Sequence, residues 1–195
     1  MESQLQQKRR SAHHAAFFKN WLHDPFQVAS VVPSSRSLAR LMATDLFPGA
    51  RVVELGAGTG TLTQALLDRG VRPTDLYLVE NNDAFARILE TRFPGATIVH
   101  TDAQTLSDRL SALAGTVDYV ISGLPIVWFD KDKKTRILDA TFTLLKPGGA
   151  LHQFTYLGKP PVTKRMMAEL QLKARLIGMT VANFPPAFVY RFMRE

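Results

Sequence analysis

From Arg51 onward, short apolar runs alternate with segments of helical periodicity, and this alternation constrains the fold more than any other feature of the chain. The pattern predicts strands over 51–55, 76–80, 96–100, 117–122, 150–156, 179–184 and 187–193, and helices over 60–70, 82–93, 103–113, 133–145 and 162–178. Strands that alternate with helices require right-handed crossovers. The sequence therefore predicts an α/β fold: a mostly parallel sheet of seven strands with helices on both faces and an antiparallel terminal strand at one edge.

Length and composition set the limits of this prediction. The 195 residues suit one domain, and 46% apolar with 21% charged residues is typical of a globular protein. The absence of cysteine excludes a disulfide framework and a thiolate metal site, and fits the cytoplasm. No apolar run resembles a secretory signal or a membrane span. The net charge of +7 favours an anionic partner, which could be nucleic acid, a membrane surface or a phosphorylated substrate.

A glycine-rich turn joins the first predicted strand to the next helix in "VVELGAGTG". Gly56, Gly58 and Gly60 allow a tight turn and let a ligand approach the backbone closely. Such a turn in an α/β sheet forms a ligand-binding crevice at the carboxyl ends of the strands. Glu80 ends the next strand, where its carboxylate could accept hydrogen bonds from both ribose hydroxyls of a nucleoside.

Two details separate this turn from a dinucleotide site. The glycines follow the pattern GxGxG, not GxGxxG, and Glu54 lies two residues before the first of them. A carboxylate there would repel a pyrophosphate but could pair with a cation. S-adenosylmethionine carries an ammonium and a sulfonium and no phosphate. Asp102 ends the third strand, where it could accept a hydrogen bond from the adenine amine.

Glu54, the three glycines, Glu80 and Asp102, on successive strand ends, resemble the class I S-adenosylmethionine-dependent methyltransferases, whose fold is Rossmann-like. The resemblance implies S-adenosyl-L-methionine as cofactor, S-adenosyl-L-homocysteine as product and no metal. The cofactor-binding residues that it implies are Glu54, Gly56, Ala57, Gly58, Thr59, Gly60, Glu80, Asn81, Asp102, Ala103 and Ser122.

The loop "SGLPIVW" after the fourth strand is where this fold usually holds the methyl acceptor. It offers no strong acid or base before Asp130, which is compatible with methyl transfer to nitrogen, because positioning supplies much of the rate. Ser122 and Gly123 are predicted to line the transfer point. Nucleobase methyltransferases typically carry a loop such as Asn-Leu-Pro-Tyr, and Gly123 and Ile126 replace its Asn and Tyr. An rRNA adenine N6-dimethyltransferase therefore remains an alternative, with fewer of its expected residues.

Several stretches, among them "SVVPSSRSLARLM", "SGLP", "QFTY" and "NFPPAFVYRF", resemble the soluble, Rhizobium-type bacterial phospholipid N-methyltransferases. The resemblance implies stepwise methylation of phosphatidylethanolamine toward phosphatidylcholine. It also implies a site for the lipid phosphate at Ser34, Ser35, Arg36 and Arg191, although the two serines could equally cap a helix. Tyr156, at the end of the fifth strand, could hydrogen-bond the amine or the phosphate and is a candidate catalytic residue together with Ser122 and Gly123.

Residues 1–24 differ from the rest of the chain and are predicted to form an amphipathic membrane-binding helix, followed by the methyltransferase domain over 25–195. The apolar members are Phe17, Phe18, Trp21 and Leu22, and the basic members are Lys8, Arg9, Arg10 and Lys19. The segment could instead pack on the domain as a lid. We expect a cytoplasmic monomer, peripheral on the inner leaflet of the cytoplasmic membrane, that binds an anionic membrane surface and no nucleic acid. A non-catalytic lipid-binding protein on the same fold is a further alternative.

Overall fold

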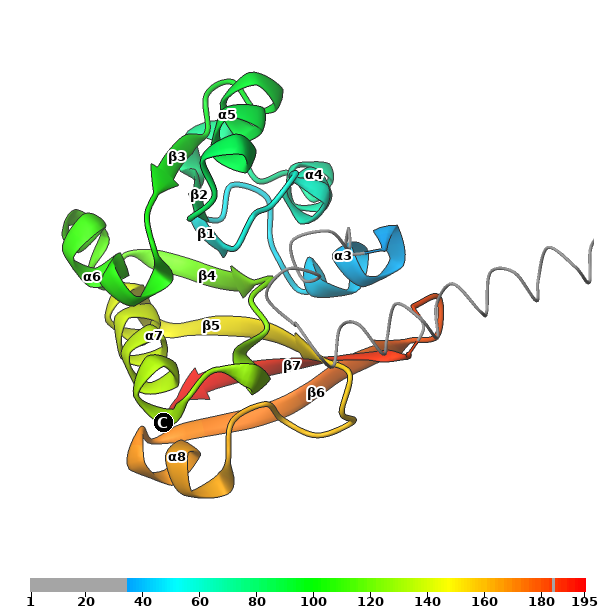
Figure 1. Ribbon diagram of the computed structural model, residues 1–195, viewed down its shortest axis with the longest axis vertical. Helices are drawn as coiled ribbons and strands as arrows, with labels where there is room; N and C mark the ends of the chain where they lie inside the picture. Colours follow the sequence, from blue (N-terminus) through cyan, green and yellow to red (C-terminus); the bar gives the residue numbers. More distant parts are fainter. Residues whose placement is uncertain (1–34, 184) are drawn as a thin grey trace, which may run out of the picture. The chain divides into compact units, whose positions relative to one another are not determined.

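The computed structural model describes residues 35–183 and 185–195, and in this part of the chain seven strands form one sheet (Figure 1). Their order is β3-β2-β1-β4-β5-β7-β6. The strands are β1 (Val52–Leu55), β2 (Leu76–Glu80), β3 (Thr97–His100), β4 (Val117–Ser122), β5 (Leu145–Thr155), β6 (Leu172–Thr180) and β7 (Ala187–Arg194).

Strands β1 to β5 are all parallel to one another, whereas β7 runs antiparallel to both β5 and β6. The carboxyl ends of β1 to β5 therefore meet at one edge of the sheet, which we call the carboxyl edge. Strand β6 shares their direction, since it and β5 both pair antiparallel with β7. The predicted Rossmann-like α/β fold with an antiparallel strand is confirmed.

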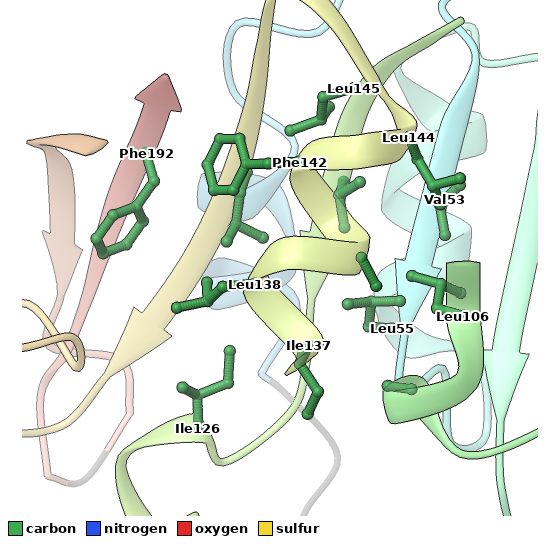
Figure 2. Packing of buried hydrophobic residues seen from close by; sticks show 14 of the residues in the cluster. Val53, Leu55, Leu106, Ile126, Ile137, Leu138, Phe142, Leu144, Leu145 and Phe192 are labelled. Atoms are coloured by element: carbon green, nitrogen blue, oxygen red, sulfur yellow. The ribbon is translucent and has the colours of Figure 1, made fainter. Parts of the chain in front are cut away.

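Two hydrophobic cores lie on opposite faces of the sheet because successive strand residues point to opposite sides. Val52 belongs to the core beneath α3 (Arg36–Met42), α4 (Thr61–Asp68) and α5 (Asp83–Arg92). Val53 belongs to the core beneath α6 (Leu106–Arg109), α7 (Lys131–Leu144) and α8 (Lys164–Glu169). Figure 2 shows Ile137, Leu138 and Phe142 of α7 within the second core.

Side-chain caps fix where four of the helices begin. Ser35 accepts from the Leu38 N–H at the start of α3, Asn82 caps α5, Asp130 caps α7, and Thr163 caps α8. Each of these residues satisfies a backbone donor that a helix leaves unpaired in its first turn. Of the two predicted caps for the first helix, the structure selects Ser35. Asp130, the first acid after the "SGLPIVW" loop, accepts from the Lys133 N–H at 2.7 Å.

The predicted helix over 162–178 is wrong in its second half. Helix α8 ends at Glu169, Gln171 adopts a φ of 55°, and residues 172–180 form strand β6 instead. The predicted strand over 179–184 overlaps this strand only at Met179 and Thr180, and residues 181–183 form a bend. The segment contains good helix formers, but antiparallel pairing with β7 outweighs that local preference.

Smaller differences occur elsewhere in the described chain. The predicted helix over 103–113 is a short α6 between two 3-10 turns, η2 (Ala103–Thr105) and η3 (Ser111–Leu113). Two more 3-10 turns are η1 (Pro73–Asp75) and η4 (Ile126–Trp128). None of the helices described is sufficiently long and apolar to cross a membrane. Ser34 and the predicted membrane helix over 1–24 lie outside the described residues.

Candidate active site

The loops after β1, β2, β3 and β4 carry most of the predicted site residues and emerge together at the carboxyl edge (Figure 1). The loop after β1 turns through Gly56, Gly58 and Gly60, with φ values of 70°, 55° and 86°. A Cβ at Gly56 would lie 2.7 Å from Leu124 Cδ2, and one at Gly60 would lie 2.1 Å from the Phe93 ring. A Cβ at Gly58 would have no heavy atom of the described residues within 4 Å. The loop is therefore closely packed at its ends and open in its middle, where a ligand can approach.

Glu80 connects the loop after β1 to the end of β2. Its Oε2 accepts the Gly58 N–H at 2.8 Å and its Oε1 accepts the Asn82 N–H at 2.8 Å. Each carboxylate oxygen keeps a second acceptor position. Glu80 can therefore hold the glycine loop in place and still accept two ribose hydroxyls, as its sequence position predicts.

Glu54 belongs to β1, two residues before the first glycine of this loop, and is completely buried. Its Oε2 accepts from the Thr63 hydroxyl at 2.7 Å, whereas its Oε1 has no hydrogen-bond partner among the described residues. Burial raises the pKa of Glu54 to about 8, the bond from Thr63 lowers it in part, and the charge of Glu80 raises it further. An unpartnered buried acceptor suits a ligand that brings a donor or a positive charge.

Asp102 follows β3 and immediately precedes the η2 turn. Its Oδ1 accepts the Gln104 N–H at 2.9 Å, and Lys133 Nζ lies 3.4 Å from its Oδ2. Burial raises the pKa of Asp102, but the Gln104 hydrogen bond and the Lys133 charge outweigh burial and hold it below its usual value. Lys133 Nζ also lies 4.6 Å from the centre of the Phe129 ring. Asp102 is thus a charged acceptor, and Lys133 is a neighbour that sequence reasoning missed.

The remaining predicted cofactor residues surround these groups. Ala57 is buried and donates its N–H to the Val79 carbonyl, and Ala103 is the buried first residue of η2. The Thr59 carbonyl accepts a hydrogen bond from Arg92. Asn81 is exposed just after Glu80. These four residues line the same end of the sheet as Glu80 and Asp102 because they belong to the same strand-end loops.

Ser122 and Gly123 bring the loop after β4 against the loop after β1. Gly123 donates its N–H to the Leu55 carbonyl at 2.8 Å, and a Cβ at Gly123 would lie only 2.9 Å from the Gly56 carbonyl oxygen. The buried Ser122 hydroxyl accepts the Leu124 N–H at 3.3 Å. The two loops are therefore in direct contact, and any side chain at position 123 would force them apart.

Gln153 on β5 supports the same loop and was not predicted as a site residue. It is 1% exposed and lies opposite Ser122 in the register of β4 and β5. Its Nε2 donates to the Leu124 carbonyl and to the Phe154 carbonyl, each at 2.9 Å. Only the paired strands place it beneath the loop, so no local sequence signal could have identified it.

Tyr156, just beyond the end of β5, joins two residues that are distant in sequence. Burial raises the pKa of Tyr156 and the neighbouring Asn183 side chain lowers it in part, while Asn183 Oδ1 accepts from the Ser35 hydroxyl. The structure therefore brings together Tyr156 and Ser35, two of the predicted acceptor residues, through a third that sequence reasoning missed. Arg36 is exposed as the first residue of α3, beside Ser35.

Arg191 is not brought to this cluster. It lies opposite His152 in the register of β7 and β5, four residues before Tyr156, which is about 13 Å along a strand. Its guanidinium is 3.8 Å from the Asp45 carboxylate. His152 is completely buried and bonded through Nδ1 to the Met42 carbonyl at 2.9 Å, as a structural residue would be.

The described residues fit S-adenosylmethionine on three observations. The middle of the glycine loop borders open space, Glu80 keeps acceptor positions for a ribose, and Glu54 has an unpartnered oxygen for a cationic group. No group of three or more metal-ligating side chains was found in the part of the chain that the structure describes.

Comparison with known proteins agrees with this geometry. The model of a family described as "Methyltransferase domain" matches residues 52–149. The ornithine lipid N-methyltransferase of Singulisphaera acidiphila is 31% identical over 169 residues, which cover 84% of this chain and 86% of that protein. The ribosomal RNA small subunit methyltransferase A of Laribacter hongkongensis is 33% identical over 67% of this chain but only 48% of its own length.

Solved structures show the same fold at low sequence identity. A TehB-like SAM-dependent methyltransferase from Corynebacterium glutamicum is 16% identical, with a TM-score of 0.63 over 95% of this chain and 100% of that chain. A 1,6-didemethyltoxoflavin-N1-methyltransferase from Burkholderia thailandensis, solved with S-adenosylhomocysteine, is 13% identical, with a TM-score of 0.62 over 97% of this chain and 90% of that chain.

Proposed function

We propose that this chain, which belongs to the class I S-adenosylmethionine-dependent methyltransferases, methylates the amine of a membrane lipid. S-adenosylmethionine is its cofactor. The acceptor that we propose is phosphatidylethanolamine and its mono- and dimethyl forms, with phosphatidylcholine as the end product. The observation that carries the lipid acceptor is the similarity to a lipid N-methyltransferase over 84% of this chain and 86% of that relative.

The geometry of the "SGLPIVW" loop supports an amine acceptor. The cofactor supplies an electrophilic methyl group on a sulfonium, so the acceptor needs only a nitrogen lone pair directed at it. Ser122 and Gly123 form a narrow wall without strong acid or base, and the nearest acid along the loop, Asp130, is engaged as the cap of α7. The chain's contribution is then to position the amine and exclude water.

A nucleobase acceptor is less well supported. Ile126, at the position of the stacking aromatic residue, is 1% exposed and packs in the hydrophobic core, as Figure 2 shows. Gly123, at the position of the amine-binding Asn, has no room for a side chain beside the Gly56 carbonyl. The rRNA methyltransferase that resembles this chain is about twice as long as the region matched.

Exposed apolar residues at the carboxyl edge support contact with a lipid surface. Leu157, Met179 and Val181 are 47%, 53% and 74% exposed, and we call these three residues the apolar rim. Leu157 follows β5. Met179 and Val181 lie at the carboxyl end of β6, which runs in the same direction as β5, so all three residues are at the carboxyl edge, where the acceptor would enter. Lys159, exposed in the same loop as Leu157, adds positive charge suited to anionic lipid. We propose that the segment over 1–24 provides a second membrane contact.

The proposal is tested with radiolabelled S-adenosylmethionine and vesicles of phosphatidylethanolamine, with and without an anionic lipid. We expect labelled mono-, di- and trimethylated lipid, with higher rates on anionic vesicles. Parallel reactions with ornithine lipid and with small-subunit rRNA discriminate between acceptors. Label that appears only on ornithine lipid would correct the head group, and label only on RNA would refute the lipid function.

A further inference from the structure

Helix α7 begins with a run of basic residues, although the start of a helix is the less favourable end for positive charge. Lys131, Lys133 and Lys134 lie in or next to its first turn, where the helix dipole presents its positive end. Two of these lysines have partners on neighbouring segments. Lys131 pairs with Glu169 of α8 at 3.7 Å, and Lys134 Nζ donates to the Val127 carbonyl at 3.0 Å. Lys133 instead reaches the predicted cofactor site.

Two contacts hold the Lys133 ammonium in place. Its Nζ lies 3.4 Å from Asp102 Oδ2, within hydrogen-bond distance, and 4.6 Å from the centre of the Phe129 ring. Phe129 is buried, and the Lys133 side chain is 24% exposed, so water competes with both contacts less than it would at the open surface. An ammonium held between an anion and an aromatic ring has little freedom to move. The position of the carboxylate is therefore restrained as well.

The same face of α7 also restrains the other oxygen of Asp102, through Gln104. Asp102 Oδ1 accepts the Gln104 N–H at 2.9 Å. The Gln104 Oε1 accepts in turn from Arg136, at 2.7 Å from Nη2 and 3.1 Å from Nε. Lys133 and Arg136 are three residues apart in the helix and so lie on one face of it. One helix therefore holds both carboxylate oxygens, Oδ2 directly and Oδ1 through the loop.

This arrangement determines what Asp102 can offer to a ligand. A carboxylate oxygen has two acceptor positions, and among the described residues Lys133 takes one on Oδ2 and leaves the second. Burial raises the pKa of Asp102, but the Gln104 hydrogen bond and the Lys133 charge hold it below its usual value, so the group is ionised and can only accept. An ionised carboxylate binds an amine and repels a carbonyl oxygen at the same place. Asp102 can therefore distinguish an amino-purine from an oxo-purine.

We propose that Lys133 is a positioning residue for the cofactor, which holds Asp102 Oδ2 so that its remaining acceptor position faces the adenine amine. Asp102 contacts the adenine, whereas Lys133 acts through Asp102 and is anchored by Phe129. The ligand class that this arrangement selects is a nucleoside with an amino group at C6 of its purine. The inference rests on the methyltransferase part of the proposed function and does not depend on which lipid accepts the methyl group.

The first test compares two ligands that differ only at C6 of the purine, S-adenosylhomocysteine and S-inosylhomocysteine, by calorimetric titration of the full chain. We expect the wild type to prefer the adenosyl ligand about thirtyfold, as a hydrogen bond to a charged group predicts. Lys133→Met removes the charge and keeps most of the apolar stem. It should weaken the adenosyl ligand about fivefold without weakening the inosyl ligand. Equal weakening of both ligands would overturn the proposal.

A matched control and a conservative variant separate positioning from folding. Lys131→Met removes a lysine two residues away that pairs with Glu169, and it should bind both ligands as the wild type does. Lys133→Arg keeps the positive charge and should restore the preference to within about twofold of the wild type. The melting temperature of Lys133→Met should not change, because a partly exposed ion pair contributes little to stability. A loss of preference in Lys131→Met as large as in Lys133→Met would contradict a specific role of Lys133.

A double-mutant cycle shows whether Lys133 acts through Asp102. Asp102→Ala should abolish the preference for the adenosyl ligand, and Lys133→Met added to it should have no further effect. A further loss of adenosyl affinity in the double variant would show that Lys133 acts by another route and would refute the proposal. If the wild type distinguishes the two ligands but labels no lipid, the proposed acceptor fails while this inference stands. If the wild type binds both ligands equally, the inference fails whatever the acceptor is.

Discussion

The two halves of the sheet build their parts of the site in different ways. In the half formed by β1 to β3, the cofactor residues lie within one or two residues of a strand end and bond to backbone groups of neighbouring loops, as Glu80 does with Gly58. In the half formed by β4 to β7, the acceptor residues come from segments far apart, and Ser35 and Asn183 are 148 positions apart. The cofactor half is therefore specified locally, and the acceptor half by tertiary contacts.

The largest effect is expected from Gly60→Ala in the cofactor half. The new Cβ would meet the Phe93 ring at 2.1 Å at a φ of 86°. Backbone strain and overpacking together should lower the free energy of unfolding by about 4 kcal/mol. Chemical denaturation measures this change. Gly115→Ala is the matched control, at a φ of 67° with no heavy atom within 4 Å in the part of the chain that the structure describes, and should lose only the backbone contribution. Equal losses would contradict the packing argument.

The next effect is the pH dependence of the free energy of unfolding that we expect from Glu54. Burial holds the pKa of Glu54 at about 8 in the folded protein, against an ordinary value of 4.5, so the folded state binds more protons than the unfolded state between these two pKa values. The stabilisation from Glu54 is fully present below its unfolded-state pKa and is lost as pH rises through its folded-state pKa. We expect the free energy of unfolding to fall by roughly 4 kcal/mol between about pH 5 and pH 9.

Glu54→Gln should remove most of this pH dependence while weakening the binding of S-adenosylhomocysteine. Urea unfolding at a series of pH values measures the first effect, and calorimetric titration the second. Glu90→Gln, an exposed glutamate on α5, serves as the control and should follow the wild type. A Glu54→Gln profile that keeps the slope of the wild type would show that another group titrates.

A smaller effect is expected when Glu80 loses its charge. In Glu80→Gln, one of the two oxygens that accept the Gly58 and Asn82 N–H groups becomes a donor. The dissociation constant of S-adenosylhomocysteine should rise about thirtyfold, or roughly 2 kcal/mol. Vesicle binding, which belongs to the other half, should not change. If the variant loses both cofactor affinity and vesicle binding, the two halves are not independent.

The smallest effect is expected at the apolar rim. Met179→Glu places a charge on the proposed lipid-facing edge and should weaken sedimentation with anionic vesicles about fivefold, close to 1 kcal/mol, without altering cofactor affinity. Ile88→Glu is the matched control, because Ile88 is 38% exposed on α5 in the cofactor half. If both variants sediment alike, the rim is not the lipid contact.

The positions of the residues in the cofactor half could be predicted because their signals are local. A glycine turn between strand and helix, and acids at strand ends, place Glu54, Glu80 and Asp102 without knowledge of strand order. Tyr156 could be placed at the end of its strand for the same reason. Asn183 and Gln153 could not, because their partners are set by the pairing of β7 with β5 and of β5 with β4. The sequence predicts helix over residues 172–178 of strand β6, because the segment contains good helix formers and its strand conformation depends on pairing with β7.

The composition of β6 has a consequence for solubility. Among the described residues β6 is an edge strand of the sheet, and one row of its backbone groups has no neighbouring strand there, which is a template for sheet-to-sheet aggregation. Its exposed Lys173 and Arg175 and the register shift between Leu176 and Gly178 oppose such pairing. The long basic side chains that give this segment its helical preference therefore also protect the sheet from joining another copy edge to edge.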